Sequence, residues 1–266
     1  MSNTLEKIIA DKKSNVEKYK NSFTVSDLKK RISSYKNYLN FKDKLKNNGV
    51  SVVAEIKKAS PSAGVIVENY EPKTIAKQYL NSGASCLSIL TEENYFKGKL
   101  EHIDEVKKEV KLPVLCKDFF IDPYQVYLAK SFGADAILII LSAIDEKTAK
   151  EIYKTAEELN MNTIVEVHTE GEARNALNFK NAIIGINNRN LHTFETRLDT
   201  TLELVEHIPN DRLVVTESGI QSAADVMAMQ QKGVHSFLIG ETLLRAPDPG
   251  KKLAELLCSH PTKEDT

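Results

Sequence analysis

Short runs of apolar and β-branched residues recur along most of the chain, and most of them are followed by segments in which apolar residues repeat every three or four positions. The first pattern is typical of buried strands and the second of amphipathic helices. The clearest helical segments are 71–83, 100–110, 146–160 and 222–233. The apolar runs predict strands at 50–56, 84–91, 112–117, 135–141, 162–167, 182–187, 212–217 and 235–240.

Continuous apolar strands that alternate with helices indicate a parallel sheet covered by helices. Eight such units favour a closed (β/α)₈ barrel, the TIM-barrel fold, over the alternative of an open doubly wound sheet. The open sheet fits less well because no GxGxxG motif follows the first strand. A glycine precedes several of the strands and predicts a helix C-cap at each of these places, at Gly49, Gly83, Gly133 and Gly233.

The segment before the first strand carries two further helical patterns. The first is formed by Leu5, Ile8, Ile9 and Val16, and the second by Leu28, Ile32, Tyr35 and Leu39. We therefore expect an N-terminal extension of two helices over 1–48, packed on the barrel. The barrel itself should cover 49–258, and a polar tail should follow over 259–266.

Composition narrows the classes of partner. The 36 basic and 37 acidic residues leave a formal charge of -1, so no overall field attracts nucleic acid or an anionic membrane. No segment is apolar over a length near the ~18 residues of a membrane span, and no signal peptide is recognisable, so we expect a cytoplasmic protein. The three cysteines should be free thiols, and the six histidines lack metal-site spacing, so no metal is expected.

Charged and polar residues stand at the carboxyl ends of most predicted strands, where TIM barrels have their active sites. Glu55 and Lys57 end the first strand, and the two-residue period places both on the face that points toward the barrel axis. Other strand ends carry Lys117, Glu166, Asn187, Arg189, Glu217 and Ser218. A solvated strand end explains any one of these residues, but the convergence of five strand ends favours an active site.

A phosphate site is predicted from the glycines after the last two strands. Ser218 and Gly219 follow the seventh strand, Gly240 follows the eighth, and we expect each to open a helix. Backbone N–H groups at helix starts bind anions, and TIM barrels commonly bind phosphate after these two strands.

Seven segments in order resemble the indole-3-glycerol phosphate synthases of tryptophan biosynthesis. They are AEIKKASPSAGVI (54–66), SILTEENYFKG (88–98), LPVLCKDFFIDPYQVYLAKSFGADAILII (112–140), IVEVH (164–168), IGINNRNLHTF (184–194), VVTESGI (214–220) and FLIGETLLRAPDPG (237–250). The amino-terminal LEKIIADKK also resembles the leading helix of that family. The resemblance spans nearly the whole chain.

The resemblance implies closure of 1-(2-carboxyphenylamino)-1-deoxyribulose 5-phosphate to indole-3-glycerol phosphate, with loss of CO2 and water. It implies a general acid at Lys117, a partner for the substrate carboxylate at Lys57, and base or electrostatic roles for Glu55 and Glu166. Asn187 completes the expected catalytic set. The resemblance further implies substrate contacts at Ser60, Phe96, Arg189, Glu217 and Ser218, and phosphate contacts at Gly219, Gly240 and Glu241.

The chemistry also yields expectations about charge. Repulsion between Lys57 and Lys117 should lower the pKa of one of them and make it a better acid. No cofactor is expected, because the attacking aromatic ring becomes an iminium cation and serves as its own electron sink. Glu241 would repel a phosphate, so we expect it to offer its backbone N–H and turn its side chain away. Ala63 and Lys99 also depart from the family pattern, without removing a catalytic group.

Other functions remain open at this point. Lys57 or Lys117 could form a Schiff base in a class I aldolase-like barrel. A non-catalytic barrel that binds a phosphorylated metabolite, or a phosphosugar isomerase of the same pathway, would not need the full set of acidic and basic residues. The expected partner is a small phosphorylated substrate, and we expect a monomer, with association with other tryptophan-pathway enzymes left open.

Overall fold

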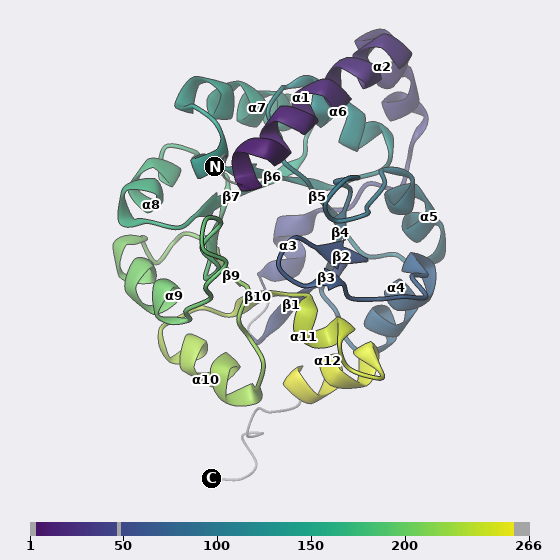
Figure 1. Ribbon diagram of the computed structural model, residues 1–266. Coiled ribbons are helices and arrows are strands. Elements are labelled where there is room, and N and C mark those ends of the chain that lie inside the picture. The colour runs from purple at the N-terminus through teal and green to yellow at the C-terminus, as the bar shows by residue number, and fades with distance from the viewer. Residues whose placement is uncertain (1–3, 47–48, 258–266) are drawn as a thin grey trace.

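A computed structural model describes residues 4–46 and 49–257 of the chain. Eight parallel strands close into a barrel, and β1 is hydrogen-bonded to both β4 and β10 (Figure 1). This closure confirms the (β/α)₈ prediction over the open sheet. The strands are β1 (Ser51–Ile56), β4 (Cys86–Leu90), β5 (Val114–Lys117), β6 (Ala136–Ile140), β7 (Asn162–Val167), β8 (Ile183–Asn187), β9 (Val214–Glu217) and β10 (Ser236–Ile239).

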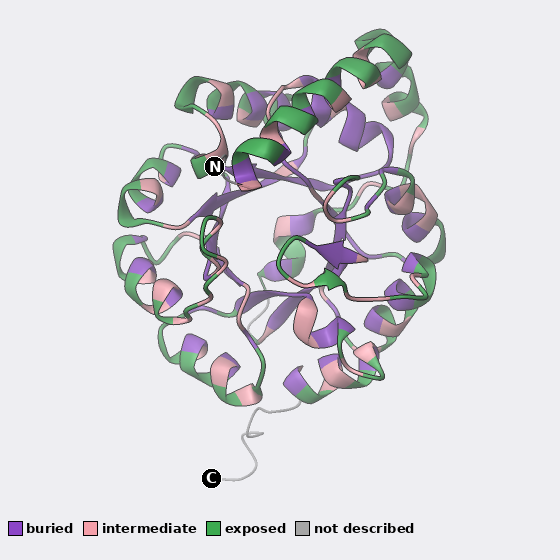
Figure 2. Cartoon of the chain, in the orientation of Figure 1, coloured by how far each residue is buried: buried purple, intermediate pink, exposed green. Residues whose placement is uncertain are grey.

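Helices form an outer ring around the barrel (Figure 1). They are α4 (Pro72–Asn81), α5 (Glu101–Glu109), α6 (Tyr124–Ser131), α7 (Glu146–Glu158), α8 (Glu170–Ala176), α9 (Asp199–Leu204), α10 (Ala223–Gln231), α11 (Glu241–Leu244) and α12 (Pro249–Leu257), with 3₁₀ turns η1 (Leu141–Ala143) and η2 (Val205–His207). Figure 2 shows their exposed faces turned outward and the strands buried. Helix α7 illustrates the cause, because Ala149, Ile152 and Ala156 recur at helical spacing and are buried.

Two apolar layers hold the barrel, one between strands and helices and one inside the ring of strands. Val53 belongs to the inner layer, together with Leu115 and Leu138 from other strands. Since side chains alternate along a strand, the residues two and four positions after Val53 share its face. These residues are Glu55 and Lys57, so the packing of β1 aims both at the barrel axis.

Glycines end several helices, as the sequence predicts. Gly83, Gly133 and Gly233 have φ angles of 90°, 97° and 80°, the left-handed conformation that favours glycine. The prediction of the same cap at Gly49 is wrong, because the helix Phe41–Leu45 already ends there with Lys46 as its C-cap, three residues before Gly49.

The extension before β1 forms three helices where two were expected, α1 (Thr4–Ser22), α2 (Val25–Ser34) and α3 (Phe41–Leu45). The second pattern stops early because Tyr35 has extended angles (φ -81°, ψ 131°) and Leu39 is exposed. Helix α1 lies along the rim of the barrel, in front of α6 (Figure 1), where Lys12 forms a buried ion pair of 2.6 Å with Asp118. Helix α3 covers the opposite end, and its Phe41 carbonyl accepts a hydrogen bond from the Cys86 thiol.

A small hairpin stands in the loop after β1, which the sequence did not predict. Strands β2 (Ala59–Ser60) and β3 (Gly64–Val65) pair antiparallel and lie beside the barrel mouth (Figure 1).

Several sequence expectations concern the chain as a whole. Cys86 and Cys116 are buried free thiols as predicted, whereas Cys258 and the tail at 259–266 lie outside the described residues. Within 4–46 and 49–257, no helix is both long and apolar enough to cross a membrane.

Candidate active site

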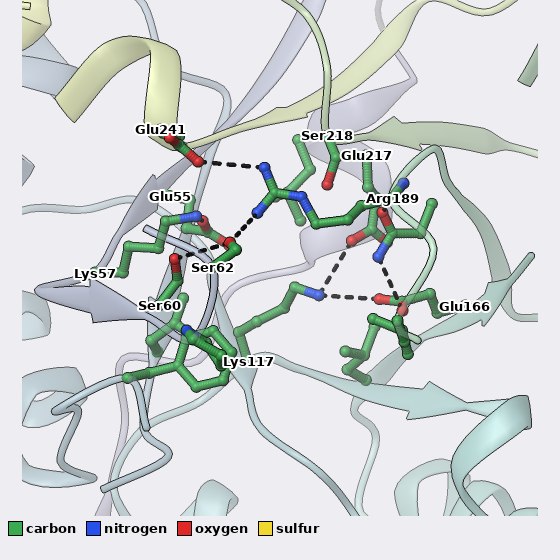
Figure 3. Close-up of a pocket in the computed structure, with 18 of the residues that line it drawn as sticks. Glu55, Lys57, Ser60, Ser62, Lys117, Glu166, Arg189, Glu217, Ser218 and Glu241 are labelled. Carbon is green, nitrogen blue, oxygen red and sulfur yellow. Dashed lines mark hydrogen bonds and ion pairs between the residues drawn. The ribbon is translucent and has the colours of Figure 1, made fainter. Parts of the chain in front are cut away.

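One pocket opens at the carboxyl ends of the barrel strands, and every site residue expected from the sequence lines it. It brings together Glu55, Lys57, Ser60, Phe96, Lys117, Glu166, Asn187, Arg189, Glu217, Ser218, Gly219, Gly240 and Glu241. Figure 3 shows the charged members pointing toward one another from different strands. The fold therefore supplies the convergence that the strand ends suggested.

Glu55 and Lys57 form an ion pair of 2.5 Å on one side of the pocket, and both residues are at most 9% exposed. Gly240, at the end of β10, makes room for this pair. A Cβ atom there would overlap the Glu55 carboxylate, with 2.9 Å to its Cδ atom. Gly240, which the sequence predicts at a phosphate site, therefore also leaves space for the Glu55 side chain.

Lys117 stands between two carboxylates on the other side of the pocket. Its Nζ atom lies 3.0 Å from Glu166 and 3.1 Å from Glu217 (Figure 3). Burial alone would lower the pKa of Lys117, but the charges of Glu166, Glu217 and Glu55 outweigh it and raise that pKa above its ordinary value. The expectation that repulsion between lysines lowers a pKa is therefore wrong for Lys117, because three carboxylates surround it.

Glu166 is held through both of its carboxylate oxygens. Oε2 faces Lys117, while Oε1 accepts a hydrogen bond of 3.1 Å from the Asn187 amide and lies 3.3 Å from Nε2 of His168. Burial would raise the pKa of Glu166, but Lys117 and His168 outweigh it and hold that pKa below its ordinary value. Glu166 is consequently an ionised carboxylate in the free protein.

Glu217 has the opposite tendency. Burial and the neighbouring charge of Glu166 raise the pKa of Glu217 to about 7, against the attraction of Lys117. Its Oε1 atom is buried and has no hydrogen-bond partner among the described residues. It faces Gly185 in the middle of β8, where a Cβ atom would overlap it. Sequence reasoning missed Gly185, although a glycine inside a strand is a known signal of close approach.

Arg189 crosses the pocket mouth and joins three elements. Its guanidinium donates to Ser62 of the hairpin loop at 3.1 Å, to Thr196 at 3.2 Å and to Glu241 of α11 at 3.2 Å. The Glu241 carboxylate also accepts from Arg245 at 2.9 Å. The Glu241 side chain was expected to turn away, but it faces Arg189 across the mouth (Figure 3), because that cation attracts it.

The apolar side of the pocket comes partly from the N-terminal extension. Leu5 and Ile8 of α1 line it together with Phe96 and Phe119, whose ring centroids are 6.3 Å apart. Ser60 is buried at the hairpin, and its hydroxyl accepts a hydrogen bond from the Ala63 N–H. The sequence predicted helix α1 but not that its side chains line the pocket.

The expected phosphate groups lie on one wall. Ser218 and Gly219 have consecutive positive φ angles of 65° and 90°, which is strained for serine. Gly240 directly precedes α11 as predicted, whereas α10 begins only at Ala223, so Ser218 and Gly219 do not open a helix. Among the described residues, no three His, Cys, Asp or Glu side chains are grouped so that they could hold a metal ion.

The fold and the pocket define a TIM-barrel protein with a charged and partly apolar pocket at the carboxyl ends of its strands. The comparisons with known proteins go further. The chain matches the family model of indole-3-glycerol phosphate synthase over residues 5–256, and it belongs to that enzyme family.

Solved structures at low identity show the fold alone. They include 3-hexulose-6-phosphate synthase from Salmonella typhimurium, at 12% identity and a TM-score of 0.65 over 79% of this chain and 97% of that one. KGPDC from Streptococcus mutans matches at 15% identity and a TM-score of 0.61, over 80% of this chain and 97% of that one. Phosphoribosylanthranilate isomerase from Thermotoga maritima matches at 13% identity and a TM-score of 0.55, over 79% of this chain and 97% of that one.

Proposed function

We propose that this protein converts 1-(2-carboxyphenylamino)-1-deoxyribulose 5-phosphate to indole-3-glycerol phosphate, CO2 and water. The observation that carries the proposal is the presence of two lysines in one pocket, each with its own carboxylate partners. Lys57 pairs with Glu55, and Lys117 pairs with Glu166 and Glu217. Such an arrangement suits a substrate that carries a carboxylate to be neutralised and a carbonyl to be protonated.

Ring closure is the first step. The aromatic carbon that carries the carboxylate attacks the ribulose carbonyl carbon, and the carbonyl oxygen takes a proton from Lys117. Lys57 faces the substrate carboxylate, while the phenyl ring packs against Phe96 in the apolar part of the pocket. The positive charge that develops on the ring lies near Glu166, which is ionised and can stabilise it.

Decarboxylation and dehydration follow from the same charges. Loss of CO2 returns an electron pair to the ring, which neutralises the iminium cation without a cofactor. The new hydroxyl then takes a second proton and leaves as water, and the adjacent methylene carbon gives one proton to Glu55 or Glu166. The enzyme gives two protons to the substrate, one to the carbonyl oxygen and one to the hydroxyl, and receives one from the methylene carbon. Each turnover therefore takes up one proton from solution.

The substrate phosphate is assigned to the wall formed by Gly219 and Gly240, beside the Arg189 and Glu241 pair. Because Glu241 is itself paired with two arginines, its charge is partly neutralised before a phosphate arrives. We assign Ser60 and Ser218 to orienting the substrate. We further propose a cytoplasmic, cofactor-independent enzyme that acts as a monomer.

The chain contains no tryptophan, so indole fluorescence that appears on addition of the substrate comes from product alone. Wild-type enzyme should produce this signal. Lys117→Met should abolish it, whereas Lys111→Met, an exposed lysine before the same strand, should keep wild-type turnover. A wild type that gives no signal at micromolar concentration, or a Lys117→Met variant that turns over normally, would exclude the proposed mechanism.

A further inference from the structure

His168 stands directly behind the carboxylate that holds Lys117. It follows Glu166 by two residues at the end of β7, and its side chain is 13% exposed. Nε2 lies 3.3 Å from Oε1 of Glu166, and Nδ1 lies 3.6 Å from Oε2 of Glu172 on α8. Both ring nitrogens are buried, and neither has a hydrogen bond to another group of the described residues.

The two carboxylates determine the charge of this histidine. A neutral imidazole has one donor nitrogen and one acceptor nitrogen, so it would turn a lone pair toward one of the carboxylates. An imidazolium carries an N–H on both nitrogens, so it turns a lone pair toward neither carboxylate. Burial alone would lower the pKa of His168, but Glu166 and Glu172 outweigh it and raise that pKa to about 9.

Other charged residues stand around His168 besides Glu166 and Glu172. Lys117 is on the far side of Glu166, and the loop after β8 contributes Glu195 and Arg197 to a polar cavity that His168 also lines. Both loop side chains belong to exposed residues, so solvent screens their influence.

The position of His168 bears on a difficulty in the chemistry. Lys117 must release a proton, yet three carboxylates stabilise its ammonium form. Glu166 divides its charge between Lys117 on one oxygen and His168 with Asn187 on the other. A positive charge on His168 reduces the net negative field at Lys117 and at the same time fixes the Glu166 carboxylate in place.

We propose that His168 is a positioning residue: as an imidazolium held between Glu166 and Glu172, it withdraws negative charge from Lys117 and keeps that ammonium able to donate its proton. This inference rests on the proposed function, in which Lys117 is the acid. It assigns a role to a residue that does not line the main pocket.

Three variants separate charge from structure. His168→Gln keeps an amide donor but removes the charge, His168→Arg keeps the charge, and Glu172→Gln removes one of the two carboxylates that hold the imidazolium. His207→Gln is the matched control, because His207 also faces a glutamate at 3.7 Å but lies outside the pocket.

The kinetic assay measures kcat and KM by indole fluorescence across the pH range. His168→Gln should lower kcat by roughly tenfold, the effect of about one pKa unit at Lys117, and leave KM within about twofold. Wild-type kcat should fall above about pH 9. His168→Arg should retain most of kcat and lose this decrease of kcat at alkaline pH. Glu172→Gln should shift the decrease to lower pH, and His207→Gln should behave as wild type.

Nitrogen-15 NMR of the substrate-free protein gives a second readout that does not depend on activity. The His168 imidazole, assigned by its loss in His168→Gln, should titrate near pH 9. Titration near the ordinary value of about 6.5 would overturn the inference, as would a His168→Gln profile identical to that of wild type. If wild type forms no indole, the proposed function fails, and the NMR titration still decides the charge of His168.

Discussion

Gly240→Ala tests whether the geometry of the Glu55 and Lys57 pair matters for catalysis. The added methyl group would lie 2.9 Å from the Glu55 Cδ atom and 3.0 Å from its Cβ atom, and closer still to Oε1. Gly240 has a φ of -127°, outside the left-handed region, so alanine adds no left-handed strain there. The substitution therefore perturbs the site more than the fold.

The size of the effect follows from the overlap. Unstrained contacts between heavy atoms lie near 3.5 Å, so the Glu55 carboxylate must move by about 1 Å, away from its 2.5 Å contact with Lys57. A displacement of about 1 Å in a catalytic group costs about 100-fold in rate, or about 2.7 kcal/mol of transition-state stabilisation. We expect kcat of Gly240→Ala to fall by about this factor.

Steady-state indole fluorescence measures the loss of catalysis, and thermal unfolding measures any loss of stability. The matched control is Gly171→Ala, because a Cβ atom at Gly171 would meet no other atom within 4 Å. The melting temperature of Gly240→Ala should stay within about 3 °C of wild type, which corresponds to about 1 kcal/mol for a domain of this size. A variant with wild-type kcat would refute the reasoning about Glu55, and so would a loss of activity that is fully explained by unfolding.

Two further predictions concern buried charges. The Lys107 ammonium lies 2.7 Å from Asp135, and Asp135→Asn should leave it buried without its anion. The free energy of unfolding, measured by denaturant titration, should fall by about 3–5 kcal/mol, while kcat stays unchanged. Glu217→Gln should gain stability relative to wild type as the pH rises from about 5 to about 8. The raised pKa of Glu217, about 7, means that the folded wild type binds more protons than the unfolded chain and loses stability over this range. A difference that is independent of pH would contradict that sign.

The strand and helix periods were sufficient to predict the barrel. All eight apolar runs became barrel strands, because each is buried on both faces and its apolar residues are continuous. The same periods placed Glu55 and Lys57 on one face and brought the strand-end residues into one pocket. Periodicity is a local property of the chain, and the barrel topology then fixes where the strand ends meet.

Features that depend on contacts between distant segments were not predictable. The charge of Lys117 depends on Glu166 and Glu217, which come from two other strands. The need for glycine at position 185 arises only when Glu217 packs against it. Helix α2 ends before Tyr35 although the apolar period continues, so the tertiary path of the chain overrides the local pattern there.

The central claim is tested most directly by following the substrate carboxylate. With substrate that carries carbon-13 in this group, wild-type enzyme should release one labelled CO2 for each indole formed, and Lys117→Met should release neither. Formation of a product that retains the labelled carboxylate, such as an isomerised sugar phosphate, would contradict the assignment of this pocket to ring closure and decarboxylation.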